Sequence, residues 1–298
     1  RFDALVPALA AAAAQTANPD ATLSRGLELI ETIARRAAYL ALLAEHPEAL
    51  GRVTKMIAAS SWAADFVTRH PLLLDELLDD RMLYAPPDWA GFERALAALL
   101  IDAAGDVERQ MNVLREHHQA QVFRLLAQDL AGLLTVERLA DHLSQLADLV
   151  LGAALGAVWA QLDARHREQP RFALIAYGKL GGKELGYASD LDLIFLYDDA
   201  DERAPEIYAR LAQRLNHWLT TRTSSGILYE TDLRLRPSGE AGLLVSSVEA
   251  FREYQERSAW VWEHQALTRA RYCAGDARVG AAFEALRTRI LVRPREAA

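Results

Sequence analysis

The segment from Ala176 to Asp198, AYGKLGGKELGYASDLDLIFLYD, places two aspartates at the start of an otherwise apolar run. Side chains alternate across a β-strand, so residues two apart share a face at roughly 7 Å along the chain. One face of this predicted strand carries Asp190, Asp192, Ile194 and Leu196, and the other carries Leu191, Leu193, Phe195 and Tyr197. Because a buried, unpaired carboxylate is costly, the two aspartates require a compensating partner.

A third carboxylate and two arginines follow in GILYETDLRLR, Gly226 to Arg236, which predicts another strand. The polar face of this strand would carry Glu230, Asp232, Arg234 and Arg236. If the two strands are neighbours with their polar faces aligned, Asp190, Asp192 and Asp232 converge with both guanidinium groups. Glu230 then lies at the margin of the group.

Such a grouping favours magnesium and phosphate chemistry. Three carboxylates are hard oxygen ligands that suit Mg²⁺, and two such ions about 4 Å apart can stabilise the attacking and leaving oxygens of a displacement at phosphorus. Arg234 and Arg236 offer forked donors to phosphate oxygens. The sequence therefore predicts a metal site made by Asp190, Asp192 and Asp232, which are also the candidate catalytic residues.

The glycine pair Gly181 and Gly182 lets backbone N–H groups approach a nucleotide without a Cβ in the way, and Ser189 can add a hydroxyl. The run GKLGGK has neither the GxxxxGK[ST] nor the GxGxxG spacing, which disfavours a standard phosphate loop or dinucleotide fold. Two structural alternatives stay open. The glycines alone could form a tight turn, and the aspartates alone could pair with nearby lysine or arginine.

The first part of the chain is predicted to be helical and to support this site. Residues 1–165 are rich in Ala and Leu with apolar residues at steps of three and four, which predicts a helical scaffold or docking region over 1–168. One helical stripe comprises Leu27, Ile30, Ile33, Ala37, Leu40 and Leu43, and Pro47 should end that helix. Another helix should begin at Thr135, with Leu139, Leu143, Leu146 and Val150 on one side.

The sequence pattern changes near residue 170 from helical periodicity to short apolar runs separated by turns. Residues 169–298 are predicted to form a catalytic domain with C-terminal helices. A strand over 172–177, a turn, a strand over 190–197, a helix opening at Pro205 and the strand over 226–236 make a compact α/β unit, and helix returns beyond it. The fold class is therefore α+β, mostly helical, with a small sheet.

Composition narrows the function classes. The 298 residues are 51% hydrophobic and 25% charged with a net charge of −8, which is a globular balance that offers no basic surface to nucleic acid. The single cysteine, Cys273, excludes an internal disulfide and predicts a packed thiol, while His117 and His118 lack further ligands at a metal spacing.

The longest apolar run, Leu149 to Ala160, is about half of what a membrane span requires, and the first residues lack the basic start, apolar segment and cleavage site that are typical of a signal peptide. A soluble, cytoplasmic protein without a membrane partner is expected. The chain opens at Arg1 without a methionine, so we interpret it as a fragment of a longer protein.

These residues also resemble a known family. A glycine pair, DxD on a strand and a third aspartate on a following strand are similar to the DNA polymerase β-type nucleotidyltransferase superfamily. More closely, YGKLGGKELGYASDLDLIFLYD, TRTSSGILYETDLRLRPSGEAGLL and SAWVWEHQALTRAR resemble the bacterial glutamine synthetase adenylyltransferases. Gly186 and Tyr187, the run from Arg222 to Gly226, and Trp260 to His264 resemble the C-terminal, AMP-attaching half of these bifunctional enzymes.

The resemblance implies a polymerase β-like domain with a small mixed β-sheet. It implies transfer of AMP from ATP to a tyrosine hydroxyl of glutamine synthetase, with release of pyrophosphate, as a regulation of nitrogen assimilation. Two Mg²⁺ ions would bind Asp190, Asp192 and Asp232, and the nucleotide would contact Gly181, Gly182, Ser189, Arg234 and Arg236. A PII signal protein and glutamine are the implied regulators of the full-length enzyme.

Two other functions stay open at this point. The same carboxylates would serve the reverse enzyme, which removes AMP by phosphorolysis and yields ADP. A catalytically silent docking module that senses a partner or glutamine is the alternative from another class.

Overall fold

The computed structural model describes residues 2–293. The chain divides into two compact units. The first, here the helical unit, comprises the residues up to Pro87 together with Gln119–Leu139; the second, here the sheet unit, comprises Asp88–His118 and the residues from Ala140 onward. This division differs from the boundary at residues 168 and 169 that the change in texture predicts, because helices from the first half of the sequence pack with the sheet. The division by function stays a prediction.

The helical unit is built from short helices. They are α1 (Phe2–Ala13), α2 (Pro19–Ile33), α3 (Ala37–Glu45), α4 (Pro47–Ala59), α5 (Ser61–Arg69), the 3₁₀ helix η1 (Pro71–Leu78) and α6 (Asp80–Leu83). Helix α8 (Val107–Leu130) begins in the sheet unit and ends in this one.

The single helix predicted over residues 27 to 43 is wrong, because the chain breaks between α2 and α3. The amide of Ala34 donates to the Glu31 carbonyl and the amide of Arg36 to the Ile33 carbonyl, which closes a turn. Helix α1 contacts both α2 and α3, so the break lets two separate apolar faces pack on one neighbour. Leu27, placed in the predicted stripe, is 43% exposed. The end before Pro47 is confirmed, since α3 stops at Glu45.

The sheet unit contains the longer helices and every strand of the described chain. Its helices are α7 (Trp89–Asp102), α9 (Val136–Ala160, of which the residues from Ala140 belong to this unit), α10 (Gly178–Gly181), α11 (Ala204–Thr220), α12 (Val248–Arg257), α13 (Val261–Ala266) and α14 (Ala277–Leu291), with the 3₁₀ turns η2 (Gly239–Ala241) and η3 (Leu267–Arg269). Its strands are β1 (Phe172–Ala176), β2 (Leu191–Tyr197), β3 (Thr231–Asp232), β4 (Val245–Ser247) and β5 (Arg271–Gly275).

Helix starts agree well with the capping signals. The predicted start at Thr135 is confirmed, because its hydroxyl accepts a hydrogen bond from the Arg138 amide at 3.3 Å and α9 begins at the next residue. The start at Pro205 is confirmed to within one residue, with the proline in the first turn of α11.

The five strands form one small mixed sheet in the order β3-β2-β1-β5, with β4 also beside β2. Strand β1 is antiparallel to β2 and β5, whereas β3 and β4 both pair with β2 in parallel. The mostly helical α+β class with a mixed sheet is therefore confirmed, and the polymerase β-like arrangement stays a prediction.

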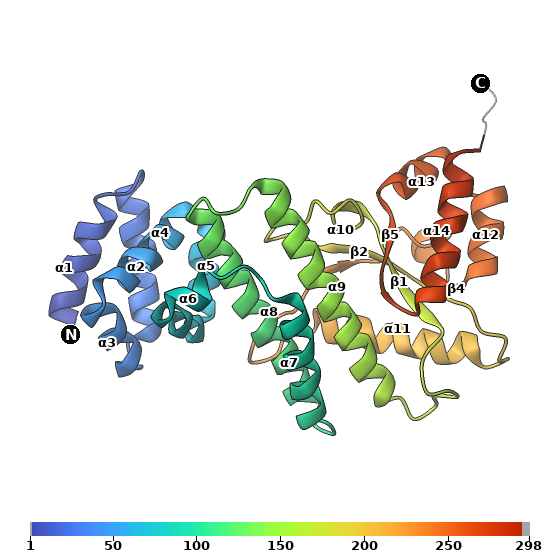
Figure 1. The fold of residues 1–298 in the computed structure, drawn as a ribbon, viewed down its shortest axis with the longest axis horizontal. Coiled ribbons are helices and arrows are strands. Elements are labelled where there is room, and N and C mark those ends of the chain that lie inside the picture. The colour runs from blue at the N-terminus through green and yellow to red at the C-terminus, as the bar shows by residue number, and fades with distance from the viewer. Residues whose placement is uncertain (1, 294–298) are drawn as a thin grey trace. The chain divides into compact units, whose positions relative to one another are not determined.

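Helices cover both faces of the sheet (Figure 1). Ile194 and Leu196 pack with Phe251 of α12 and Phe283 of α14 in one buried cluster. On the reverse face the ring of Phe195 stacks on Phe172, which in turn stacks on Tyr208 of α11. The alternation predicted for β2 is thus confirmed. The face that carries the aspartates at its start is the face that α12 and α14 cover further along.

The third strand is much shorter than predicted. Only Thr231 and Asp232 pair with β2, because the chain turns directly after Asp232. Glu230, Asp232, Arg234 and Arg236 therefore do not share one face of a continuous strand. Strands β4 and β5 were not predicted from the sequence, which indicates helix beyond the strand over 226–236.

One described helix, α9, has the length and apolar composition of a membrane span. Its apolar side, which includes Leu146, Val150 and Leu155, is buried inside the sheet unit. The burial accounts for its composition as that of a core helix. Cys273 is buried as predicted, and its thiol donates to the Leu174 carbonyl.

Arg115 of α8 is completely buried, and its guanidinium group donates to four backbone carbonyls. The acceptors are Met111, Trp218, Thr221 and Gly226, at 2.6 to 2.8 Å. Burial lowers the pKa of Arg115 to about 10, so the group remains charged at neutral pH. This one side chain fastens α8 to the end of α11 and to the turn that leads into β3.

Replacing Arg115 by methionine should lower the free energy of unfolding by about 3 kcal/mol, because four buried carbonyls lose their donor. Lysine should recover part of the loss, since it keeps the charge without the fork. Urea unfolding measures both. The matched control is Arg109→Met on the same helix, whose ion pair with Asp102 is more than half exposed and should contribute little. Equal effects of the two methionine variants would contradict the role given to Arg115.

Candidate functional site

The site is built where β2 and β3 begin side by side. Asp192 and Asp232 are register partners in this parallel pair, and the Leu191 amide donates to the Glu230 carbonyl at 3.0 Å. Asp190 lies just before β2 and is exposed. The structure therefore brings the second and third predicted aspartates directly opposite each other, and all three belong to one electrostatic group.

Asp192 is the least favourably placed charge of this group. Desolvation raises its pKa, and the charges of Asp190 and Asp232 raise it further, against the smaller effects of Lys179 and Arg234. Gly178 packs tightly beside it: with a φ of +54°, a Cβ at this glycine would lie 2.0 Å from Oδ2 of Asp192. The left-handed glycine is thus required for the backbone to pass this carboxylate.

Asp232 is neutralised by Arg234. Its Oδ1 accepts from the Arg234 backbone amide at 2.8 Å, and the Arg234 Nε lies 3.0 and 2.9 Å from the two carboxylate oxygens. The Arg234 Nη2 also pairs with Oδ2. These hydrogen bonds, above all from the side chain, lower the pKa of Asp232. Arg234 itself is mostly exposed, so this pairing is accessible to an incoming anion or cation.

Arg236 holds the loop that follows. Its guanidinium group donates to the carbonyls of Leu233 at 2.7 Å, Glu240 at 3.1 Å and Gly242 at 3.3 Å. The structure therefore gives Arg236 a loop-fixing role in addition to the predicted phosphate contact. The loop from Leu233 to Gly242, which we name the catalytic loop after the function proposed below, is shaped by this residue.

An open cavity of about 670 Å³ lies over these residues. It is lined by Asp190, Asn216, Thr231, Asp232, Leu233, Arg234, Arg236 and Glu240. The Thr231 hydroxyl donates to Oδ1 of Asn216 at 2.6 Å, which fixes the orientation of that amide. Carboxylates and arginines thus share one cavity wide enough for a phosphate-bearing ligand.

The predicted nucleotide-binding glycines end the short helix α10, with Gly181 as its last residue and Gly182 as its C-cap. The amide of Gly181 donates to the Tyr177 carbonyl at 2.9 Å and that of Gly182 to the Gly178 carbonyl at 3.0 Å. A Cβ at Gly181 would meet the Arg269 carbonyl oxygen at 2.1 Å. Close packing therefore requires Gly181, and the predicted contact of these amides with a phosphate stays a prediction.

Ser189 closes the turn before β2. Its hydroxyl accepts from the Gly186 amide at 3.0 Å, and its own amide donates to the Gly186 carbonyl. The serine thus sets the direction in which the chain enters β2 at Asp190. Its contact with a nucleotide stays a prediction.

Several residues of the site were not predicted from the sequence. Gly178 and Lys179 border Asp192, and Asn216 and Glu240 line the cavity. The Gly178-Lys179 pair directly follows a predicted strand, a signal that could have drawn it into the site. Asn216 carries no such signal, because its position depends on how α11 packs beside β3.

The donor set fits a hard divalent cation. Among residues 2–293, no group of three or more histidine, cysteine, aspartate or glutamate side chains is already arranged around one metal position. Asp192 and Asp232 nevertheless face each other with Asp190 close enough to raise the pKa of Asp192, and carboxylate oxygens are what Mg²⁺ prefers. Metal binding would require Arg234 to release an oxygen of Asp232.

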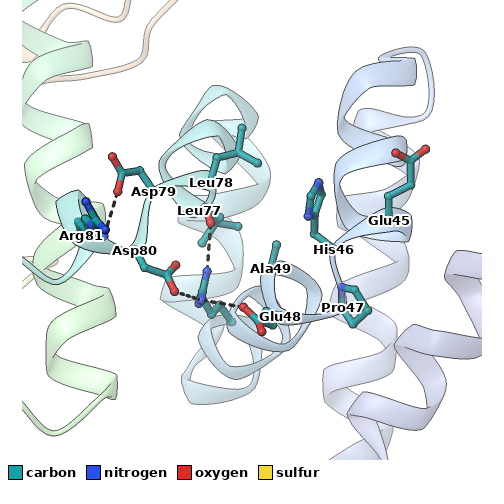
Figure 2. Close-up of a pocket in the computed structure, with 11 residues that line it drawn as sticks. Glu45, His46, Pro47, Glu48, Ala49, Leu77, Leu78, Asp79, Asp80 and Arg81 are labelled. Carbon is teal, nitrogen blue, oxygen red and sulfur yellow. Dashed lines mark hydrogen bonds and ion pairs between the residues drawn. The ribbon is translucent and has the colours of Figure 1, made fainter.

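A second pocket, of about 550 Å³, lies in the helical unit (Figure 2). It is lined by the turn from Glu45 to Ala49 and by the residues from Leu77 to Arg81. Arg52 crosses it, donating to the Leu77 carbonyl at 3.0 Å and pairing with Asp80 at 2.5 Å. These contacts join α4 to η1 and α6, so we assign the charged groups of this pocket to packing.

Gly181→Ala should destabilise the protein by roughly 1–3 kcal/mol, because its Cβ collides with backbone atoms that cannot move independently. Gly156→Ala in α9 is the matched control, since a Cβ added at this glycine would meet nothing within 4 Å. The control should gain about 0.5–1 kcal/mol from helix propensity. Thermal unfolding of the two variants gives the comparison, and a neutral Gly181→Ala would remove the packing role.

Asp192→Asn should stabilise the metal-free protein by roughly 0.2–1 kcal/mol, because it removes a like charge opposite Asp232. The pKa of Asp192 is raised, so the wild-type carboxyl becomes neutral before an ordinary aspartate as pH falls. The difference between variant and wild type should therefore shrink towards acid. Urea unfolding with a chelator at neutral and mildly acidic pH measures this, and a destabilised variant would contradict the repulsion.

Comparison with known proteins identifies the family. The model of the glutamate-ammonia ligase adenylyltransferase family matches residues 50–286. The chain is 62% identical over its whole length to the bifunctional glutamine synthetase adenylyltransferase/adenylyl-removing enzyme of Aromatoleum aromaticum, of which it covers 32%.

Further relatives carry the same name. The protein of Chromobacterium violaceum is 58% identical over 298 residues, all of this chain and 33% of the relative, and that of Neisseria meningitidis is 52% identical over 296 residues, 99% of this chain and 33% of the relative. The chain thus spans about a third of the length of the curated relatives it matches. Since the family model covers most of its residues, the chain belongs to the glutamate-ammonia ligase adenylyltransferase family.

Proposed function

We propose that this chain is the nucleotidyltransferase module that moves AMP from ATP to a tyrosine hydroxyl of glutamine synthetase and releases pyrophosphate. The observation that carries the proposal is the pairing of Asp192 with Asp232 at the edge of a cavity that also holds Asp190 and two arginines. The names of the relatives support adenylyl transfer as the reaction and glutamine synthetase as the protein substrate.

Asp190, Asp192 and Asp232 would hold the magnesium that this reaction uses. Bound there, two Mg²⁺ ions would supply charge neutralisation at the α-phosphate and at the leaving pyrophosphate. Burial, and then the charges of Asp190 and Asp232, raise the pKa of Asp192 in the free protein, and bound cations would offset this accumulated negative charge.

The arginines and the surrounding turns have complementary roles. Arg234, exposed and paired with Asp232, is the group that can turn to the departing phosphates when the aspartate takes another partner. Arg236 keeps the catalytic loop in place and adds positive charge beside it. Gly181, Gly182 and Ser189 fix the approach of the chain to β2 and are proposed to border the nucleotide.

The covalent step is a displacement at the α-phosphorus of ATP. A bond forms between this phosphorus and the tyrosine oxygen, the bond to the pyrophosphate oxygen breaks, and the tyrosine proton is released. Positioning of the hydroxyl and neutralisation of charge are what the residues of the cavity provide, as in phosphoryl transfer generally.

Removal of AMP by phosphorolysis, which yields ADP, is the second candidate, because the relatives are named for both activities. The same carboxylates would serve it. The segments around Gly186, Arg222 and Trp260 resemble the attaching half, and this favours AMP attachment as the direction. A silent docking module is disfavoured by the intact set of aspartates.

The remaining assignments concern the longer polypeptide. We propose that a PII signal protein and glutamine regulate it, that the helical unit scaffolds or docks the target, and that the protein is cytoplasmic without nucleic-acid or membrane partners. The net charge of −8 supports the exclusion of nucleic acid.

The test uses the natural polypeptide that contains this chain, with labelled ATP, Mg²⁺ and purified glutamine synthetase. Asp190→Asn should lower AMP transfer by at least about 100-fold while the fold is retained. Asp198→Asn is the matched control, because this exposed aspartate lies at the other end of β2 and should leave transfer unchanged.

A parallel assay with adenylylated glutamine synthetase and phosphate separates the two directions. If Asp190→Asn spares AMP attachment but abolishes ADP formation, the chain is the removing module. If both activities survive the substitution, the carboxylate site is wrong, and calorimetry showing no Mg-ATP binding to this module would support the docking alternative.

A further inference from the structure

Two tryptophans and a valine stand exposed in one short run of the sheet unit. Trp260 is 70% exposed, Val261 68% and Trp262 57%, whereas Trp159 and Trp218 of the same unit are buried. Large contiguous apolar side chains on a surface are typical of an interaction site, and tryptophan is enriched among residues that dominate binding energy.

The buried side chain of Glu263, which is only 8% exposed, fixes the backbone of the exposed run by hydrogen bonds. One carboxylate oxygen of Glu263 accepts from the Trp260 amide at 2.8 Å, and the other accepts from the Tyr254 hydroxyl at 2.9 Å. His264 adds a hydrogen bond to the Gln255 carbonyl at 2.8 Å. The tryptophans are thus presented on a fixed backbone, which lowers the entropic cost of binding.

The same network reaches the catalytic loop. Burial raises the pKa of the Tyr254 hydroxyl, and the nearby backbone of Ser238, which follows Arg236 by two residues, lowers that pKa by a smaller effect. Gly242 packs against Pro237 in this loop, and the next residue, Leu243, is 79% exposed. Tyr254 therefore contacts Glu263 beneath the exposed tryptophans and lies near the loop that carries Arg234 and Arg236.

We propose that Trp260, Val261 and Trp262, with Leu243, form the docking surface for the protein substrate. This rests on the proposed function, in which the acceptor tyrosine belongs to glutamine synthetase. A macromolecular acceptor must bring its hydroxyl to the aspartates, so a second, apolar contact beside the catalytic loop can fix its position. The surface would bind an apolar patch of glutamine synthetase next to that tyrosine.

The test measures the binding of glutamine synthetase and the binding of Mg-ATP separately, using the natural polypeptide. The variant Trp260→Ala/Trp262→Ala should raise the KM for glutamine synthetase at least about tenfold and weaken its direct binding in the absence of ATP by a similar factor. The affinity for Mg-ATP, measured by calorimetry, should stay unchanged. The double phenylalanine variant should recover most of the binding, because it retains apolar rings.

Ile101→Ser is the matched control, since Ile101 of α7 is 75% exposed in the same unit and should leave both affinities unchanged. Unchanged binding of glutamine synthetase by the double alanine variant would overturn the proposal. A parallel loss of Mg-ATP affinity would also overturn it and would assign the tryptophans to the nucleotide. Protection of the tryptophans from acrylamide quenching in the free polypeptide would show that other segments of that polypeptide cover them, which overturns it as well.

Failure of the proposed function gives a different result. In that case the wild-type polypeptide transfers no AMP to glutamine synthetase, whatever stands at residues 260 and 262. A comparison of direct glutamine synthetase binding by the wild type and by the double alanine variant then still tests whether these residues form the docking surface.

Discussion

The structure of this site depends on one electrostatic constraint. Parallel pairing of β2 with β3 places Asp192 opposite Asp232, with Asp190 next to them, and like charges in register destabilise a strand pair. In the free protein the conflict is reduced by Arg234, which binds Asp232 with both backbone and side chain, and by the charge of Lys179. A site that holds negative charge at this cost is suited to divalent cations and phosphates.

The remainder of the sheet unit keeps these carboxylates in place. The apolar continuation of β2 is packed between α12 and α14 on one face and the aromatic stack of Phe172, Phe195 and Tyr208 on the other. Arg115 fixes the turn from Thr221 to Gly226, and this turn sets where β3 begins. The Arg234 side chain, which is mostly exposed, can change its partner when a ligand arrives.

Much of the site could be predicted because a period of two is a local property. The alternating faces of β2 follow from residue spacing, whereas the grouping of Asp190 and Asp192 with Asp232 was expected only if the two strands are neighbours, as they are. The hydrogen bonds from Arg234 to the carboxylate of Asp232 could not be predicted. They require the chain to turn directly after the two residues of β3 that pair with β2. Arg115 looks like any charged residue of a long helix, since its four acceptors include three from distant parts of the sequence. Strands β4 and β5 are short and partly polar, so their pairing partners define them more than their own residues do.

If the three aspartates hold the metal and nucleotide, a crystal structure of the protein with Mn²⁺ and a non-hydrolysable ATP analogue will show both ligands at this site. We expect anomalous density from manganese at Asp190, Asp192 and Asp232, with the Arg234 side chain moved from Asp232 to the phosphates. Manganese and nucleotide bound elsewhere, with Arg234 still paired to Asp232, would contradict this role of the aspartates.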